Sequence, residues 1–177
     1  MKRVRICSDG SAQSPRTKGG SKEAGGCAAV VEWESSEHEI VVACSGERAT
    51  TIGRMELLGA ITGMRYLHWL SGQPENNLDL KDVHLDMIVD SMFVYKSATG
   101  AAGRGKNHDL WKEFDSLGGL FGGVAIDHRP RNTLRNMEEA DRLAGKIRQA
   151  ILAGQNDHVV NMVETRGYIV LEFGANI

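Results

Sequence analysis

The order of strand-like and helical patterns along the chain restricts it to few folds. Three β-branched, apolar runs come first, a long helical stretch follows, and two further strands then alternate with helices. An antiparallel meander followed by helical crossovers predicts an α/β fold with a mixed five-stranded sheet flanked by helices. The expected strands are 4–7, 27–34, 39–45, 83–89 and 124–127, and the expected helices are 54–70, 91–98, 108–117 and 137–152.

Loops and a tail complete the expected organisation. Polar residues 8–11 predict a turn after the first strand, and the stretch 13–26, rich in Gly, Ser, Lys and Arg, predicts a loop. One domain is expected over 1–152, followed by a C-terminal extension of unknown role over 153–177. The apolar run 168–173 in this extension fits either an extra strand or an oligomer contact.

One acid lies among the core residues of the long helical stretch. Glu56 shares a helix face with small residues three, four and seven positions further along. These are Gly59, Ala60 and Gly63. Each glycine inside a helix costs roughly 1 kcal/mol of stability relative to alanine. We therefore expect that these small residues are present because this face of the helix packs closely against another element. A carboxylate that points inward must be protonated, paired or bound to a cation.

Three other acids have comparable positions. Asp9 follows the first strand, Asp90 ends the fourth, and Asp141 precedes small residues in the last helix. If the first and fourth strands are parallel neighbours, Asp9 and Asp90 emerge side by side. Plainer interpretations exist, since Asp9 fits a turn and Asp90 fits a helix N-cap. Glu56 and Asp141 also fit helix acids that reach solvent or an arginine.

A shared metal site explains all four acids together. Clustered carboxylates repel one another strongly unless cations lie among them. A ligand set made only of oxygen favours Mg²⁺, with Mn²⁺ as a substitute, over Zn²⁺, which usually takes His or Cys. Two such ions about 3.5–4 Å apart suit phosphodiester hydrolysis.

Four segments carry more specific patterns, namely SDGS at 8–11, TTIGRMEL at 50–57, VDS at 89–91 and EADRLA at 139–144. In this order, within a stretch from about residue 3 to 150, they resemble type 1 ribonuclease H in a compact form without a basic protrusion. The resemblance implies a ribonuclease H-like fold and endonucleolytic cleavage of the RNA strand of RNA/DNA hybrids by two metal ions. The implied products carry 5′-phosphate and 3′-hydroxyl ends.

The resemblance also assigns roles to individual residues. Its four metal-binding acids match Asp9, Glu56, Asp90 and Asp141. His128 resembles the loop histidine that assists water activation or product release, although a surface histidine is the plainer alternative. The positions expected to approach the hybrid are Gly10, Ser11, Thr51, Ser91 and Asn136.

The chain departs from the family where side chains contact the minor groove. Ile52 and Gly53 replace a common asparagine, and Met92 replaces a common glutamine. Both changes remove side-chain hydrogen bonds to the hybrid, so recognition is expected to depend more on backbone amides.

Basic residues are few where some family members have a basic protrusion. The connection 100–107 carries only Arg104 and Lys106, so affinity for nucleic acid is expected to be modest and its salt dependence shallow. Arginines at 129, 131 and 135 either compensate in part or are solvated loop residues.

Composition is consistent with an intracellular globular protein. The formal net charge of −2 does not indicate a nucleic-acid binder by bulk electrostatics. No apolar run approaches the roughly 20 residues of a membrane span, and the start lacks a signal-peptide pattern, so a cytoplasmic location is expected. The three cysteines are expected to be free, buried thiols. Protein partners cannot be identified from the sequence.

Two alternatives remain beside a hybrid-cleaving nuclease. The first is a nucleic-acid-binding or assembly module of the same fold with little or no turnover. The second is a different nuclease or strand-transfer enzyme on this scaffold. Proofreading exonucleases of related architecture have an Asp-x-Glu pair in the first strand, whereas here Asp9 is followed by Gly10 and Ser11.

Overall fold

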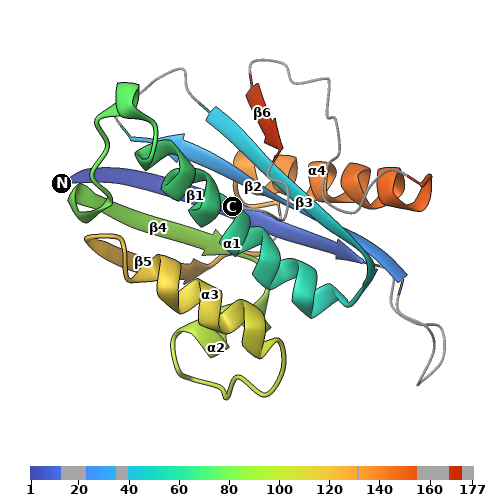
Figure 1. The fold of residues 1–177 in the computed structure, drawn as a ribbon. Helices are drawn as coiled ribbons and strands as arrows, with labels where there is room; N and C mark the ends of the chain where they lie inside the picture. Colours follow the sequence, from blue (N-terminus) through green and yellow to red (C-terminus); the bar gives the residue numbers. More distant parts are fainter. Residues whose placement is uncertain (13–22, 35–39, 131, 155–167, 173–177) are drawn as a thin grey trace.

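The computed structural model describes residues 1–12, 23–34, 40–130, 132–154 and 168–172, which form a six-stranded sheet with helices on both faces (Figure 1). The strands lie in the order β5-β4-β1-β2-β3-β6. They are β1 (Lys2–Ala12), β2 (Glu23–Trp33), β3 (Ile40–Thr50), β4 (Val83–Val89), β5 (Gly123–His128) and β6 (Tyr168–Glu172). The helices are α1 (Ile52–Ser71), α2 (Met92–Ala98), α3 (His108–Gly118) and α4 (Arg135–Leu152), with short 3₁₀ turns η1 (Pro74–Asn76) and η2 (Leu80–Asp82).

The pairing of the strands confirms the predicted meander and crossovers. β2 runs antiparallel to β1 and to β3, whereas β4 runs parallel to β1 and β5 runs parallel to β4. The five strands β1 to β5 therefore form the predicted mixed sheet of an α/β fold. β6 adds a sixth strand, parallel to β3, within the run for which the sequence left a strand or an oligomer contact open.

The turn predicted at 8–11 is wrong, because β1 continues through these residues. Pairing with β2 keeps them extended, and β2 itself begins inside the loop predicted at 13–26. The remainder of that loop, 13–22, lies outside the described residues. Gly10 is explained by packing rather than by a turn, since a Cβ there would overlap the backbone of Glu56 on α1.

Two hydrophobic cores lie on the two faces of the sheet. α1 packs over β1, β2 and β3 on one face, with α3 beside it, and α4 packs on the other face (Figure 1). The small-residue face of α1 does lie against the sheet. A Cβ on Gly59 would come within 2.9 Å of the Asp9 carbonyl oxygen, and one on Gly63 within 2.8 Å of the Ile6 side chain. This close approach brings the first turns of α1 next to Asp9.

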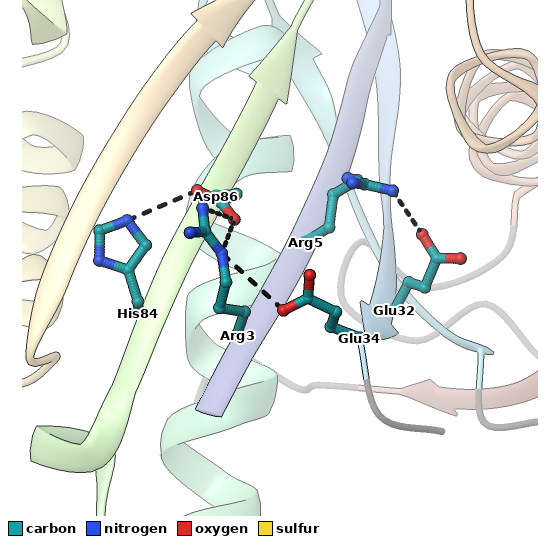
Figure 2. Close-up of polar contacts among 6 residues, drawn as sticks. All are labelled: Arg3, Arg5, Glu32, Glu34, His84 and Asp86. Carbon is teal, nitrogen blue, oxygen red and sulfur yellow. Dashed lines mark hydrogen bonds and ion pairs between the residues drawn. The ribbon is translucent and has the colours of Figure 1, made fainter. Parts of the chain in front are cut away.

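Charged side chains replace apolar ones on part of the sheet (Figure 2). Arg3 donates hydrogen bonds of 2.7–3.0 Å to Asp86 on the neighbouring strand β4, and Arg5 donates to its cross-strand partner Glu32 at 3.2 Å. Because these pairs are largely exposed, each contributes about 0–1 kcal/mol. Their larger effect is on strand pairing, since opposite charges on neighbouring strands favour one register over the others.

None of the helices in the described parts of the chain has the length and apolar character that crossing a membrane requires.

Candidate metal and nucleic-acid site

Three carboxylates from three separate elements meet at one end of the sheet. Asp9 of β1, Glu56 of α1 and Asp90 after β4 each place a carboxylate oxygen within 4.8 Å of the others. Asp9 is 1% exposed and Glu56 is 8% exposed, whereas Asp90 is half-buried. The group is therefore enclosed on the side of the sheet and open on the side of Asp90.

Strand register explains why the two aspartates lie together. The last residues paired between β1 and β4 are Ser8 and Val89, so Asp9 and Asp90 are the next residues of two parallel neighbours. Asp90 is not the N-cap of α2, because Ser91 takes that role by accepting a hydrogen bond from the Val94 amide at 3.4 Å. The plainer interpretation of Asp90 is therefore wrong.

The other plain interpretations are also limited by the structure. Asp9 accepts a hydrogen bond of 2.7 Å from the Gly10 amide, but it does so within a strand and not in a turn. Arg54, the arginine nearest to Glu56 in sequence, pairs with Glu47 and Asp109 at 2.9 and 2.8 Å. Its charge is thus already balanced by two other acids.

The donor set of the cluster fits a hard divalent cation. Carboxylates that share a site with little solvent repel one another, and a cation among them removes this penalty. All three donors are carboxylate oxygens, and no histidine or cysteine belongs to this three-residue group. Such a set suits Mg²⁺ or Mn²⁺ better than Zn²⁺.

The fourth predicted acid is not part of this group. Asp141 lies on α4, which packs against the face of the sheet opposite to α1, and its side chain is half-buried. Among the described residues, the cluster whose oxygens lie within 4.8 Å of one another contains Asp9, Glu56 and Asp90. The structure thus brings together three of the four predicted acids.

His128 lies close to the cluster, although not on a loop. It is the last residue of β5 and pairs with Val89. Its Nε2 lies 3.1 Å from the carbonyl oxygen of Asp90, and its ring lies 6.0 Å from that of Tyr95. A carbonyl oxygen only accepts hydrogen bonds, so Nε2 carries the proton and Nδ1 of the neutral ring is left as an acceptor.

The positions expected to contact substrate have different environments. Gly10 is buried beneath α1, and Ser11 is half-buried within β1. Thr51 is the exposed N-cap residue of α1 and makes no capping hydrogen bond with its side chain. The Ser91 hydroxyl caps α2, and the Asn136 amide donates to Glu32 at 3.2 Å. Local structure therefore already accounts for Gly10, Ser91 and Asn136.

Arg104 has a structural role in the glycine-rich connection. Its guanidinium lies 4.3 Å above the ring of Trp111, and it donates to the Ser97 carbonyl at 3.2 Å and to Asp115 at 2.6 Å. Lys106 in the same connection is exposed. Of the other arginines considered, Arg129 pairs with Asp127, residue 135 is exposed, and residue 131 lies outside the described residues.

Sequence reasoning missed one feature of this region. Phe93 is 38% exposed and adjoins Met92, which is 43% exposed, at the start of α2. The signal was present, because an apolar pair directly after the aspartate-serine motif is unusual for the polar start of a helix beside a charged site.

Comparisons with known proteins agree with the geometry. No family model matches the chain. A ribonuclease H of Nitrosomonas eutropha is 29% identical over 170 residues, which cover 89% of this chain and 96% of that protein.

Solved structures give the fold independently. The N-terminal ribonuclease H domain of a Mycobacterium tuberculosis protein superposes with a TM-score of 0.69 at 21% identity, over 88% of this chain and all of that one. LC11-RNase H1 in complex with an RNA/DNA hybrid superposes with a TM-score of 0.64 at 17% identity, over 84% of this chain and 99% of that one.

Fold and site together define an α/β protein with a ribonuclease H-like fold and a cluster of three acids, two of which are buried. More particularly, the resemblance to type 1 ribonuclease H that the sequence motifs predict is confirmed, by fold and by sequence similarity over most of the chain.

Proposed function

We propose that the chain is a metal-dependent endoribonuclease that hydrolyses the RNA strand of RNA/DNA hybrids. The observation that carries this proposal is the convergence of Asp9, Glu56 and Asp90 within 4.8 Å of one another, two of them nearly inaccessible to solvent. The similarity to a ribonuclease H, and to the fold of a ribonuclease crystallised with an RNA/DNA hybrid, supports this choice of substrate.

Two Mg²⁺ ions, replaceable by Mn²⁺, are the proposed cofactors. Asp9, Glu56 and Asp90 would hold them, with Asp141 as a further ligand from α4. When bound, such ions supply an activated water and offset the charge that develops on the phosphate and the leaving oxygen. Cleavage of the bond between phosphorus and the 3′ oxygen gives 5′-phosphate and 3′-hydroxyl products.

The protein itself contributes rigid placement of these acids. Asp9 lies inside a strand, and Gly10 and Gly59 allow α1 to approach that strand closely. Preorganised carboxylates need no rearrangement when substrate binds, which favours the charged transition state. His128 is proposed to hold or take a proton at Nδ1, because its Nε2 is engaged with the Asp90 carbonyl.

Substrate contacts are proposed at the open side of the cluster. Thr51 lies at the N-terminus of the 20-residue helix α1, where backbone amides favour a phosphate. Ser11 and the backbone near Gly10 are proposed to approach the RNA strand, where contact with the 2′-hydroxyl distinguishes RNA from DNA. Residues 1–152 are proposed as the catalytic domain, with 153–177 as an extension outside it.

A cleavage assay with matched variants tests the proposal. A labelled RNA/DNA hybrid should be cut in its RNA strand in Mg²⁺ and left intact in EDTA. Asp9→Asn should abolish cleavage while its thermal unfolding shows a folded protein. Asp82→Asn, the same change at an exposed aspartate in η2, should leave cleavage unchanged. Full activity of Asp9→Asn would contradict the assigned site.

A second candidate is a nucleic-acid-binding module of the same fold with little turnover. The apolar side chains of Ile52 and Met92 beside the acids favour it, because polar groups common in the family are replaced there. Hybrid binding without cleavage in both Mg²⁺ and Mn²⁺ would support this alternative. Comparing cleavage of hybrid, duplex RNA and single-stranded DNA separates both candidates from a nuclease of another specificity.

A further inference from the structure

The carboxylate of Glu32 on β2 joins three elements of the fold. Its Oε2 accepts a hydrogen bond from Nη1 of Arg5, the residue opposite on β1, at 3.2 Å (Figure 2). The same oxygen accepts a second hydrogen bond, also at 3.2 Å, from the side-chain amide of Asn136 in the first turn of α4. We call the hydrogen bonds of Glu32 to Arg5 and Asn136 the Glu32 bridge.

The helix α4 begins without a side-chain cap. Its N-cap residue is Leu134, which makes no capping hydrogen bond with its side chain, whereas Ser, Thr, Asp or Asn commonly supplies an acceptor at this position. Met137 in the first turn is buried in the core on this side of the sheet, but apolar contact has no preferred direction. The hydrogen bond from Asn136 to Glu32 is directional, and a carboxylate near a helix N-terminus also interacts favourably with the helix dipole. The Glu32 bridge thus fixes where α4 begins on the sheet.

The strand and the helix that this bridge joins both carry acids of the proposed site. Side chains alternate along a strand, so Arg5, Cys7 and Asp9 share one face of β1. Cys7 belongs to the core cluster that includes the buried residues of α4, so this is the face on which α4 packs. Along α4, Asp141 follows Asn136 by five residues, a rise of about 7.5 Å. The place where α4 begins therefore sets how close Asp141 comes to Asp9.

We propose that Glu32 is a positioning residue of the acid site; this inference rests on the proposed function. Through Asn136, Glu32 sets the place of α4, and hence of Asp141 relative to Asp9. Glu32 is not a member of the three-acid cluster, so it acts through α4 and not as a metal ligand. Hydrogen bonds that orient the ligands of a metal are worth about 10–100-fold in metal affinity or activity. The bridge also gives the Asn136 amide a role that needs no contact with substrate.

Metal binding by matched variants tests the inference. Calorimetry measures Mg²⁺ binding to the free protein, and cleavage of a labelled hybrid over a range of Mg²⁺ concentrations gives kcat and KM. Glu32→Ala should bind Mg²⁺ about tenfold more weakly and lower kcat at limiting Mg²⁺ about tenfold, with KM for the hybrid changed by less than about twofold. Glu32→Gln keeps a side-chain oxygen that accepts a hydrogen bond from Asn136, so its Mg²⁺ affinity should stay within about threefold of that of the parent.

Two further changes separate positioning from general stability. Asn136→Ala removes the same hydrogen bond from the side of α4. It should match Glu32→Ala, and the double variant should be no worse than either, because the effects of losing one shared contact do not add. Asp86→Asn is the control, since it removes a carboxylate from the Arg3 pair, which joins β1 to β4 and not the sheet to α4. This variant should keep the Mg²⁺ affinity and kcat of the parent.

The outcomes separate this inference from the proposed function. Equal losses in Glu32→Ala and Asp86→Asn would overturn the positioning role, because the effect would then be general destabilisation. A higher KM with unchanged Mg²⁺ binding in Asn136→Ala would also overturn it, since Asn136 would then be a substrate contact. If the unmodified chain cleaves hybrids and Glu32→Ala matches it in Mg²⁺ binding and kcat, only the inference fails. If the unmodified chain neither binds Mg²⁺ nor cleaves hybrids, the proposed function fails and the inference with it.

Discussion

The ring of His128 is tied to the backbone of Asp90, with Nε2 3.1 Å from the carbonyl oxygen of an acid whose side chain belongs to the carboxylate cluster. The link joins the ends of β5 and β4, which are paired at Val89 and His128. Backbone contact fixes both the orientation of the ring and its tautomer. A histidine held in this way is suited to proton transfer, since its acceptor nitrogen does not have to be oriented anew in each cycle.

Replacing His128 should therefore affect the chemical step more than binding. His128→Ala is expected to lower kcat on a labelled hybrid by about 10²-fold, with KM changed by less than about threefold. His68→Ala, at an exposed histidine near the end of α1, is the control and should keep full activity. A large rise in KM with kcat preserved would show that His128 holds substrate and does not act on a proton.

Glycine at position 10 should be required by packing. Gly10→Ala places a Cβ against the backbone of Glu56, so it is expected to destabilise the fold by about 1–3 kcal/mol and to displace an acid of the cluster. Gly145→Ala is the matched control, because nothing lies within 4 Å of its Cβ position in α4. It should instead stabilise by about 0.5–1 kcal/mol. Urea unfolding of both variants measures the difference, and equal effects would contradict the observed packing.

Some elements of the fold can be predicted from local sequence, whereas others depend on contacts with distant segments. β4 is predicted with its observed bounds, because a run that alternates apolar and polar residues before ending in Met87, Ile88 and Val89 is bounded by the charged Asp82 and Asp90. The turn at 8–11 was wrong because Gly10 and Ser11 have turn chemistry, whereas the packing of α1 and the pairing with β2 keep them extended. Propensity within a few residues cannot report such contacts with distant segments.

The candidate site shows the same division. Convergence of Asp9 and Asp90 follows from one assumption about strand order, which the pairing of β1 with β4 satisfies. The placement of Asp141 depends on how far α4 reaches along the sheet, and a helical pattern does not encode that distance. The partner of β6 is also non-local, so an apolar run could not be assigned to the edge of β3 in advance.

An ion-pair bridge between α1, β3 and α3 should stabilise the fold in a pH-dependent way. Arg54 joins Glu47 and Asp109. Burial opposes the charged form of Asp109, but the hydrogen bond and charge of Arg54 outweigh it, so the pKa of this carboxyl lies below its usual value. A lowered pKa gives stability that is present above the unfolded-state pKa of about 3.9 and lost as pH falls through the folded-state value.

Arg54→Met should reveal that dependence. Its free energy of unfolding is expected to be lower than that of the parent by about 1 kcal/mol or less at pH 7. The part of the difference that comes from Asp109 should disappear as pH falls below about 4. Asp109→Asn should lower the free energy of unfolding at pH 7 by the same Asp109-dependent part. Urea titrations at several pH values between 7 and 2 measure it, and a difference that stays constant over this range would exclude the bridge as its source.

The three cysteines should make the fold sensitive to alkali. Burial raises the pKa of the Cys7 and Cys27 thiols to about 12, and burial likewise raises that of Cys44. A thiol whose pKa is higher in the folded state stabilises the protein below the unfolded-state pKa of about 8.5, and this contribution is lost as pH rises towards the folded-state value. All three thiols should therefore be inert to a thiolate-specific reagent at pH 8 and react fully in urea.

Alanine variants resolve the contribution of each thiol. Between about pH 9.5 and 11, each buried cysteine should steepen the fall in unfolding free energy by about 1.4 kcal/mol per pH unit. Cys7→Ala and Cys27→Ala should each make the slope of unfolding free energy against pH shallower by this amount. This change in slope is independent of the effect of either substitution on stability at pH 7. Lysines and tyrosines also titrate in this range, but they contribute equally to parent and variant and cancel in the comparison. Parallel curves for parent and variants would mean that the thiols are not protected from ionisation in the folded state.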